Sequence, residues 1–453
     1  MNANNLINRW WVVFGAILIQ LCLGAIYAWS VFTPALKVAG WSQLETQIVF
    51  AVGLASFALV MVFAGDKLQK WGPRTLAIAG GLTLGCGYLV AGLSGGTDFW
   101  GVCLGVGVIG GAGIGLAYVV PIAVGMRWFP EHKGMITGLA VAGFGFGAMA
   151  WVKIAGSWGN LIESLGMAQT MMIYGVAFAT LVIIGSIWMV MPPAGWLPEG
   201  YTPPEQKGGV GKDDFSQQDM LKTPQFYLIF ATFAVSAGAG LMSIGLMKLY
   251  PMEALQMSGY TMLEASAIAG TAMAVFFSIA NGAGRIIWGT ISDQLGRKKS
   301  VMYMAGSQGV ILLLFTLMAG NEYLLYLGAA LIGFNFGGNF ALFPALTADE
   351  FGNAAVGKNY PLVFLSYGVG GILFPILGGV LGDIGNFPLA FAICGFACLF
   401  GAVAIALVFP PRQDEAHQPF SVHGFLHHAH VFDHAVVDDL FHHDSLRRKP
   451  ISK

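Results

Sequence analysis

Hydrophobic residues occur along this chain in long runs, and short polar segments separate the runs. An α-helix needs about 20 apolar residues to cross the roughly 30 Å hydrocarbon core of a bilayer. Twelve runs have about this length, near residues 10–34, 46–65, 75–95, 99–125, 134–157, 170–191, 226–249, 263–289, 300–319, 322–346, 359–382 and 387–409. The pattern therefore predicts an all-α membrane protein with twelve transmembrane helices.

The longest polar interval separates the sixth run from the seventh. It begins with a proline-rich stretch, which interrupts helices because proline lacks a backbone N–H, and continues with Asp213, Asp214 and Asp219. This composition predicts a linker between two six-helix halves. The predicted segments are an N-terminus at 1–9, halves at 10–191 and 226–409, the linker at 192–225 and a histidine-rich tail at 410–453.

Positive charges are distributed unequally between the two sides of the predicted bundle. Cytoplasmic loops of membrane proteins carry an excess of Lys and Arg. With the N-terminus in the cytoplasm, 18 of the 22 Lys and Arg residues lie on the inner side, three lie near the outer edge, and Arg285 lies within a span. We therefore predict that both termini are cytoplasmic.

The composition agrees with lipid surroundings. Hydrophobic residues make up 56% of the chain and charged residues 10%, against roughly 25% charged residues in soluble domains. The 64 glycines suit helices that pack closely in a membrane. This excludes a soluble enzyme and predicts a lipid bilayer as the surroundings, and the net charge of −1 predicts no nucleic-acid partner.

The two predicted halves contain similar segments. The segment Gly65–Arg74 follows the second run and Gly289–Lys298 follows the eighth, at an offset of 224 residues. The aromatic-glycine pairs at 144–145 and 367–368 repeat at an offset of 223. A parallel repeat of six helices, with the substrate bound between the halves, is a transporter architecture.

These two loops resemble the signature of the major facilitator superfamily, Gly-x-x-x-Asp-x-x-Gly-Arg-Lys/Arg. The second copy matches the acidic position with Asp293, whereas the first copy has Gln69 there. The resemblance implies the major facilitator fold and loops that stabilise one closed state. The residues to which it gives this gating role are Gly289, Asp293, Gly296, Arg297, Lys298 and Arg74.

Six further motifs are similar to the oxalate:formate antiporter family, whose members are relatives of the monocarboxylate transporters. The motifs are Tyr27–Trp29, Arg127–Gly134, Met220–Phe226, Asn281–Arg285, Ala341–Pro344 and Asn359-Tyr360. The resemblance extends over residues 9–410. It implies a carrier of small carboxylates in the bacterial inner membrane.

Arg285 is the residue that the sequence itself singles out. An arginine within a span costs at least ~2.5–3.5 kcal/mol and normally faces a cavity or a partner. Arg285 lies eight residues before Asp293, which places it about 12 Å from the inner edge. No Asp or Glu lies deep in any predicted span. We therefore expect a substrate carboxylate as its partner; the alternative is a structural arginine bonded to backbone carbonyls.

Three aromatic residues are predicted at the same depth. Tyr118 precedes Arg127 by nine residues, Tyr367 follows Lys358 by nine, and Phe340 precedes Asp349 by nine, or about 13 Å in each case. This indicates a binding site at the membrane midplane. The alternative for each tyrosine is ordinary packing, with its hydroxyl on a backbone carbonyl.

The family resemblance adds further site residues. In relatives that carry oxalate, a cage of aromatic residues and two cations surrounds the dianion. The matching positions are Tyr27, Tyr118, Phe144, Arg285, Phe336, Phe340 and Tyr367. Tyr367 replaces the second cation, so a second carboxylate would remain buried without a partner. We therefore predict a monocarboxylate such as lactate, pyruvate or formate.

Asn281 lies four residues before Arg285, on the same helix face. Proton-coupled monocarboxylate carriers of animals have an aspartate in this place, and an asparagine takes up no proton. Any proton coupling would therefore follow another route. The alternative is that Asn281, Asn335 and Asn339 form interhelical hydrogen bonds.

The sequence as a whole predicts a monomeric secondary transporter of small carboxylates without a cofactor or metal. Two other readings stay open: an oxalate/formate antiporter, and a membrane sensor whose tail signals to a partner. The tail holds eight of the nine histidines, among several aspartates. Either metal binding or a loosely ordered amphipathic segment fits that composition.

Overall fold

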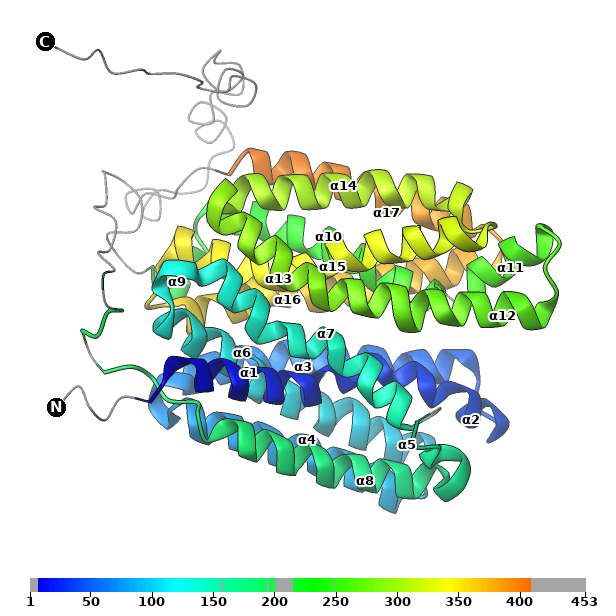
Figure 1. Ribbon diagram of the computed structural model, residues 1–453, viewed down its shortest axis with the longest axis horizontal. Coiled ribbons are helices and arrows are strands. Elements are labelled where there is room, and N and C mark those ends of the chain that lie inside the picture. Colours follow the sequence, from blue (N-terminus) through cyan, green and yellow to red (C-terminus); the bar gives the residue numbers. More distant parts are fainter. Residues whose placement is uncertain are drawn as a thin grey trace, which may run out of the picture.

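The computed structural model of the chain is a bundle of long helices (Figure 1). It describes residues 7–155, 158–193, 195–198, 200, 215–247 and 249–408, and this part contains no β-strand. The N-terminal residues 1–6, most of the linker and the histidine-rich tail lie outside the described residues. The boundaries of the five predicted segments therefore stay predictions.

The helices of the first half and the linker are α1 (Arg9–Leu23), η2 (Gly24–Val31), α2 (Thr33–Val38), α3 (Gln43–Trp71), α4 (Pro73–Leu93), α5 (Phe99–Val102), η3 (Cys103–Gly110), α6 (Gly111–Trp128), η4 (Pro130–His132), α7 (Lys133–Ala155), α8 (Leu161–Ser186) and α9 (Gln217–Met220). Those of the second half are α10 (Pro224–Leu246), α11 (Leu249–Met257), α12 (Met262–Thr271), η5 (Ala272–Phe277), α13 (Ser278–Leu295), α14 (Arg297–Met318), α15 (Glu322–Phe351), α16 (Val356–Asp383) and α17 (Phe387–Ala406).

Twelve helical stretches of the described chain are long and apolar enough to cross a membrane. This confirms the predicted number of spans. Several helices extend further than the hydrophobic runs: the eighth stretch ends at Leu295 and the tenth at Phe351. The hydrophobic pattern marks where lipid contact stops, whereas the helix continues through polar residues until a residue ends it. At Leu295 that residue is Gly296, whose φ of +92° favours glycine.

The two halves lie side by side, with α1 to α8 in the lower part of Figure 1 and α10 to α17 in the upper part. They meet mainly where α7 packs on α13 and α15, and where α3 packs on α16. The end of the bundle that holds α9 and the start of α1 is called the linker end below. The other end holds α5 and α11 (Figure 1).

Backbone contacts close the interface between the halves near the linker end. A Cβ on Gly289 would lie 2.2 Å from the carbonyl oxygen of Gly134, and one on Gly65 would lie 2.5 Å from that of Gly357. Gly65 and Gly289 are the first residues of the two repeated loop segments. The sequence repeat is therefore also a repeat of helix contacts.

The first span changes its helix type before it ends. The α-helix α1 passes into the 3-10 helix η2 at Gly24, where a Cβ would lie 2.1 Å from the carbonyl oxygen of Phe144. The glycine therefore lets η2 lie directly on α7. This contact brings Tyr27, on η2, next to Phe144 on α7.

Candidate functional site

Arg285 lies between the two halves, on α13, and its side chain is fully buried. Its Nε donates a hydrogen bond to Asn281 Oδ1 at 3.2 Å, and its Nη1 donates to the carbonyl oxygen of Val141 on α7 at 3.1 Å. Its Nη2 is buried and has no hydrogen-bond partner among the described residues. The alternative expected from the sequence is a structural arginine bonded to backbone carbonyls. Only Nη1, one of the three guanidinium nitrogens, makes such a bond.

The ion pairs found among the described residues do not include Arg285. Its guanidinium carbon instead lies 4.2 Å from the centre of the Phe340 ring and 5.3 Å from that of Phe144. A desolvated cation–π contact contributes about 2 kcal/mol, which is less than the several kcal/mol that burying an ion costs. An anion beside Nη2 would therefore be strongly stabilised.

The aromatic residues predicted from the family resemblance surround this guanidinium. Ring centres are 5.0 Å apart for Tyr27 and Phe144, and 5.5 Å apart for Tyr118 and Phe144. In the second half, Phe340 lies 5.2 Å from Phe336 and 5.5 Å from Tyr367. The structure thus brings together all eight predicted binding residues: Tyr27, Tyr118, Phe144, Asn281, Arg285, Phe336, Phe340 and Tyr367.

A direct hydrogen bond joins the two halves at this cluster. The hydroxyl oxygens of Tyr27 and Tyr367 are 2.6 Å apart. One of these hydroxyls donates to the other, so a single O–H of the pair is left to donate elsewhere. Both side chains are buried.

Three further aromatic residues belong to the cluster, and the sequence did not indicate their role. Phe57 on α3 lies 5.0 Å from Tyr118 and 4.9 Å from Phe364, and Tyr360 lies 5.7 Å from Phe364. Phe364 could have been found, because it precedes Tyr367 by three residues on one helix face. Phe57 lies in an apolar run with nothing to distinguish it.

The hydroxyl groups of Tyr118 and Tyr360 are buried without a hydrogen-bond partner among the described residues. Buried polar groups in folded proteins are almost always paired, and each exception needs an explanation. The charge of Arg285 acts on both hydroxyls, and also on those of Tyr27 and Tyr367. Unpaired donors and an unpaired cation therefore occur in one place.

The three asparagines differ in their contacts. Asn335 links helices, because its Oδ1 accepts from Trp288 Nε1 and its Nδ2 donates to Ser307 Oγ, each at 3.1 Å. This is the interhelical role expected as an alternative. Asn339 donates to carbonyl oxygens of its own helix. Asn281 holds the guanidinium of Arg285, so it faces the site through the arginine.

The second signature loop joins the halves at the linker end. Asp293 Oδ1 and Oδ2 accept from the backbone N–H groups of Gly134 and Met135, at 3.0 and 2.8 Å. These N–H groups belong to the first turn of α7, where the helix dipole favours negative charge. Arg297 lies 2.6 Å from Asp293 and also pairs with Asp349 at 3.1 Å, which in turn pairs with Lys133 at 3.0 Å.

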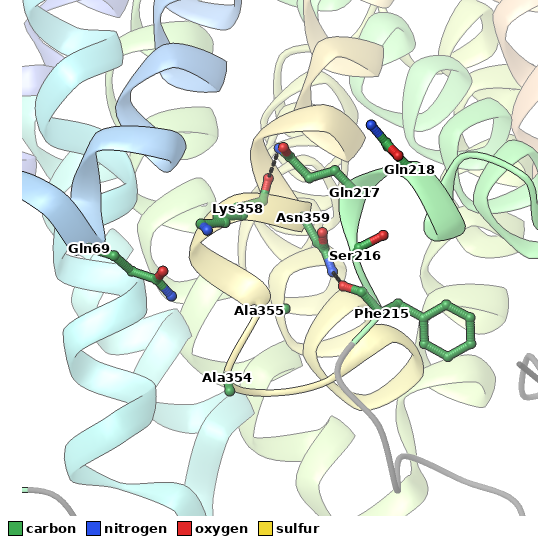
Figure 2. A pocket seen from close by; sticks show the side chains of 9 residues that line it. All are labelled: Gln69, Phe215, Ser216, Gln217, Gln218, Ala354, Ala355, Lys358 and Asn359. Carbon is green, nitrogen blue, oxygen red and sulfur yellow. Dashed lines mark hydrogen bonds between the residues drawn. The ribbon is translucent and has the colours of Figure 1, made fainter.

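The first signature loop approaches the opposite half through the backbone at Gly65 and Gly357, but among the described residues it has no counterpart of the Asp293 hydrogen bonds. Gln69 instead borders a cavity of about 440 Å³ at the start of α16 (Figure 2). The segment before α10 closes the other side of that cavity: Gln217 Nε2 donates to the carbonyl of Lys358 at 3.0 Å, and Asn359 Nδ2 donates to that of Phe215 at 2.9 Å (Figure 2). Arg74 donates to the carbonyl of Ile187, within its own half.

Comparisons with known proteins agree with this architecture. The pattern that describes the Major Facilitator Superfamily matches residues 10–277 and 263–444. The chain is 26% identical to the oxalate:formate antiporter of Oxalobacter formigenes, over 90% of this chain and 92% of that protein. It is 28% identical to an uncharacterised transporter of the superfamily in Escherichia coli (strain K12), YhjX, over 80% of this chain and 86% of that protein.

A more distant sequence relative and a solved structure agree with this architecture. Human monocarboxylate transporter 12 is 22% identical, over 87% of this chain and 79% of that protein. The solved structure of the proton:xylose symporter XylE superposes with a TM-score of 0.63 at 12% identity, over 90% of this chain and 98% of that one. At that identity it shows the fold alone. The chain therefore belongs to the Major Facilitator Superfamily, and the predicted resemblance to its oxalate:formate antiporter family is confirmed.

Proposed function

We propose that this membrane transporter carries small monocarboxylates of the lactate, pyruvate or formate type, and that Arg285 binds the carboxylate. The observation that carries the proposal is the buried Nη2 of Arg285, which has neither an acidic partner nor a hydrogen bond among the described residues. A carboxylate supplies both the missing charge and the missing acceptor. Tyr118 and Tyr367 orient the bound acid as a whole, and Asn281 fixes the guanidinium.

The wall of the site favours one carboxylate over two. Besides Arg285, the cluster consists of Phe and Tyr rings and Asn281. A second carboxylate would be buried against these rings with no cation to offset it. The Phe side chains of Phe144, Phe336 and Phe340 suit a short carbon chain instead.

The transport cycle follows from the interface between the halves. We assign the linker end to the cytoplasm of a bacterial inner membrane, from the excess of Lys and Arg on that side. Gly289, Asp293, Gly296, Arg297 and Lys298 then stabilise a state that is closed toward the cytoplasm. Alternating access requires that these contacts break in each cycle. Since one chain forms the whole site, a monomer suffices.

Counterflow in proteoliposomes with a panel of labelled monocarboxylates tests the proposal. Lysine at position 285 keeps the charge but loses the planar, multiply donating guanidinium. We expect Arg285→Lys to reduce counterflow more than tenfold, with and without a pH gradient. Arg9→Lys is the matched control, because Arg9 is partly exposed and pairs with Glu131 at the linker end. Counterflow of Arg285→Lys at the rate of the control would refute the carboxylate-binding role.

An oxalate/formate exchanger is the second candidate, since the Oxalobacter formigenes relative carries that name and covers 90% of this chain. Competition separates the two candidates. The monocarboxylate proposal expects unlabelled formate to inhibit labelled lactate counterflow and oxalate to inhibit it at least tenfold more weakly. Equal inhibition by oxalate would favour the exchanger.

A further inference from the structure

Three polar groups of the site lack hydrogen-bond partners and are neighbours of one another. Among the described residues, Arg285 Nη2 and the hydroxyls of Tyr118 and Tyr360 are buried without hydrogen-bond partners. The hydroxyls of Tyr118 and Tyr360 are close enough to interact with each other, and both feel the charge of Arg285, but no well-aligned hydrogen bond joins these groups. The ring of Phe364 contacts both tyrosines, at 5.3 Å from Tyr118 and 5.7 Å from Tyr360. Three groups that can donate hydrogen bonds therefore lie close together, and none of them makes a hydrogen bond of normal geometry to a described residue.

The other two tyrosines of the site, Tyr27 and Tyr367, also feel the charge of Arg285, but their hydroxyls are already paired. The hydroxyls of Tyr27 and Tyr367 hydrogen-bond to each other, and the Phe336 ring lies 6.0 Å from that of Tyr27. A group bound there would meet a largely satisfied pair of hydroxyls and an aromatic ring. This suits a methyl or carbonyl-bearing end better than a carboxylate, whose two oxygens accept about four hydrogen bonds.

Tyr360 and Phe336 mark the two ends of the site along the long axis of the bundle, with Arg285, Tyr118 and Tyr367 between them. On α16, Tyr360 precedes Tyr367 by seven residues, which places it about 10 Å nearer to the linker end. α15 runs in the opposite direction, because its last turn carries Asp349, which pairs with Lys133 at the linker end. Phe336 therefore lies one turn farther from the linker end than Phe340.

We infer that Tyr360 is a carboxylate-binding residue, and that the acid lies with its carboxylate toward the linker end, between Arg285, Tyr118 and Tyr360. This rests on the proposed function. The carbon chain then extends toward Phe336 and the Tyr27–Tyr367 pair. Tyr360 contacts the part that all monocarboxylates share, whereas Phe336 contacts the part in which they differ.

Tyr360→Phe tests the inference, because it removes the hydroxyl and keeps the ring on Phe364. We expect the half-saturation concentration to rise about tenfold, which is the effect of a lost hydrogen bond to a charged group. The factor is the same for lactate, pyruvate and formate in counterflow. In contrast, we expect Phe336→Leu to raise the half-saturation concentration for lactate and pyruvate at least threefold more than that for formate.

Tyr174→Phe is the matched control. Tyr174 is also buried, but it donates its hydroxyl proton to the carbonyl of Trp151, in the first half. Its loss leaves the half-saturation concentrations within about twofold and lowers the unfolding temperature of the purified protein. Tyr360→Phe removes an unpaired hydroxyl, so we expect no decrease in that temperature. A decrease equal to that of Tyr174→Phe would show that Tyr360 has a structural role and would overturn the inference.

Two other outcomes also overturn it. Unchanged half-saturation for all three acids in Tyr360→Phe excludes contact with the carboxylate; if Arg285→Lys still abolishes counterflow, the proposed function stands and only the inference fails. A rise for lactate without a rise for formate places Tyr360 at the carbon chain, and the orientation is then reversed. If neither Tyr360→Phe nor Arg285→Lys differs from wild type in counterflow, the proposed function itself fails.

Discussion

At the scale of single residues, the site depends on how the guanidinium of Arg285 is held. Asn281 Oδ1 accepts from Nε and the Val141 carbonyl accepts from Nη1, so two neutral acceptors fix its plane while leaving its charge uncompensated. Neutral acceptors orient a cation without competing with an anionic ligand. Asn281 therefore needs a neutral amide as well as its place beside Arg285, because a charged acceptor there would compete with the substrate.

Asn281→Asp changes that amide into a carboxylate of the same shape. The introduced carboxylate pairs with Arg285 and competes with the substrate, so each bound acid requires a proton on it. We expect the half-saturation concentration for lactate to increase with pH, by up to tenfold per unit, between about pH 5.5 and about pH 7.5 in counterflow. In wild type the half-saturation concentration changes by no more than about twofold over this pH range. Asn281→Ala adds no charge, so it changes the half-saturation concentration by the same factor at every pH. A flat profile for Asn281→Asp would contradict this description.

Part of this site can be predicted from the sequence. The depth of Arg285, Tyr118 and Tyr367 follows from counting helix residues from the nearest charged loop. The counting fails for Tyr360, only two residues after Lys358, because the ring of a tyrosine spans several ångströms that the count ignores. The Val141 carbonyl was also out of reach, since every residue has one and only the packing of α7 on α13 selects it.

At the scale of elements, the two repeated loops have diverged. Asp293 binds the first turn of α7 through two backbone N–H groups. Gln69 occupies the repeated position but borders a cavity at the start of α16, which the segment around Phe215 and Gln217 contacts instead (Figure 2). The repeat of the fold is visible in the sequence. The sequence does not show that linker residues contact α16 where the other half uses the carboxylate of Asp293, because these linker residues resemble any polar segment.

Asp293→Asn removes the negative charge that the first turn of α7 stabilises. Such a charge contributes about 1 kcal/mol, which corresponds to roughly a fivefold change in population. We expect the linker end to open more often. Spin labels at Lys70 and Lys299, both exposed and on different halves, report this as a larger share of long distances in pulsed electron resonance.

Gln69→Asp is the matched variant, because it places a carboxylate at the repeated position, toward the start of α16. We expect the opposite shift, toward short distances, and slower counterflow, since the linker end must open in each cycle. If both variants shift the distances in the same direction, the signature loops do not act as separate contacts.

At the scale of the whole molecule, transport requires the halves to separate and meet again. They meet through backbone at Gly289 and Gly134, where a side chain on Gly289 would lie 2.2 Å from a carbonyl oxygen. A carbonyl of α7 cannot move aside as the end of a flexible side chain can, because it is fixed in the helix. The approach of the halves therefore depends on the absence of a Cβ at this place.

Gly289→Ala should hold the halves apart at the linker end while each half stays folded, because the added methyl group would clash with the Gly134 carbonyl of the opposite half, whereas it would make an ordinary contact with Ala341 of its own half, at 3.4 Å. We expect counterflow to fall more than tenfold, long distances to dominate between labels at Lys70 and Lys299, and lactate binding to weaken because Val141 on α7 moves away from Arg285.

Gly379→Ala is the control: this glycine also lies in a membrane helix, on α16, but nothing lies within 4 Å of its added Cβ. Because alanine is a better helix former than glycine, Gly379→Ala should transport normally and unfold at the same or a higher temperature. Normal counterflow in Gly289→Ala would mean that the halves complete the cycle without this backbone contact.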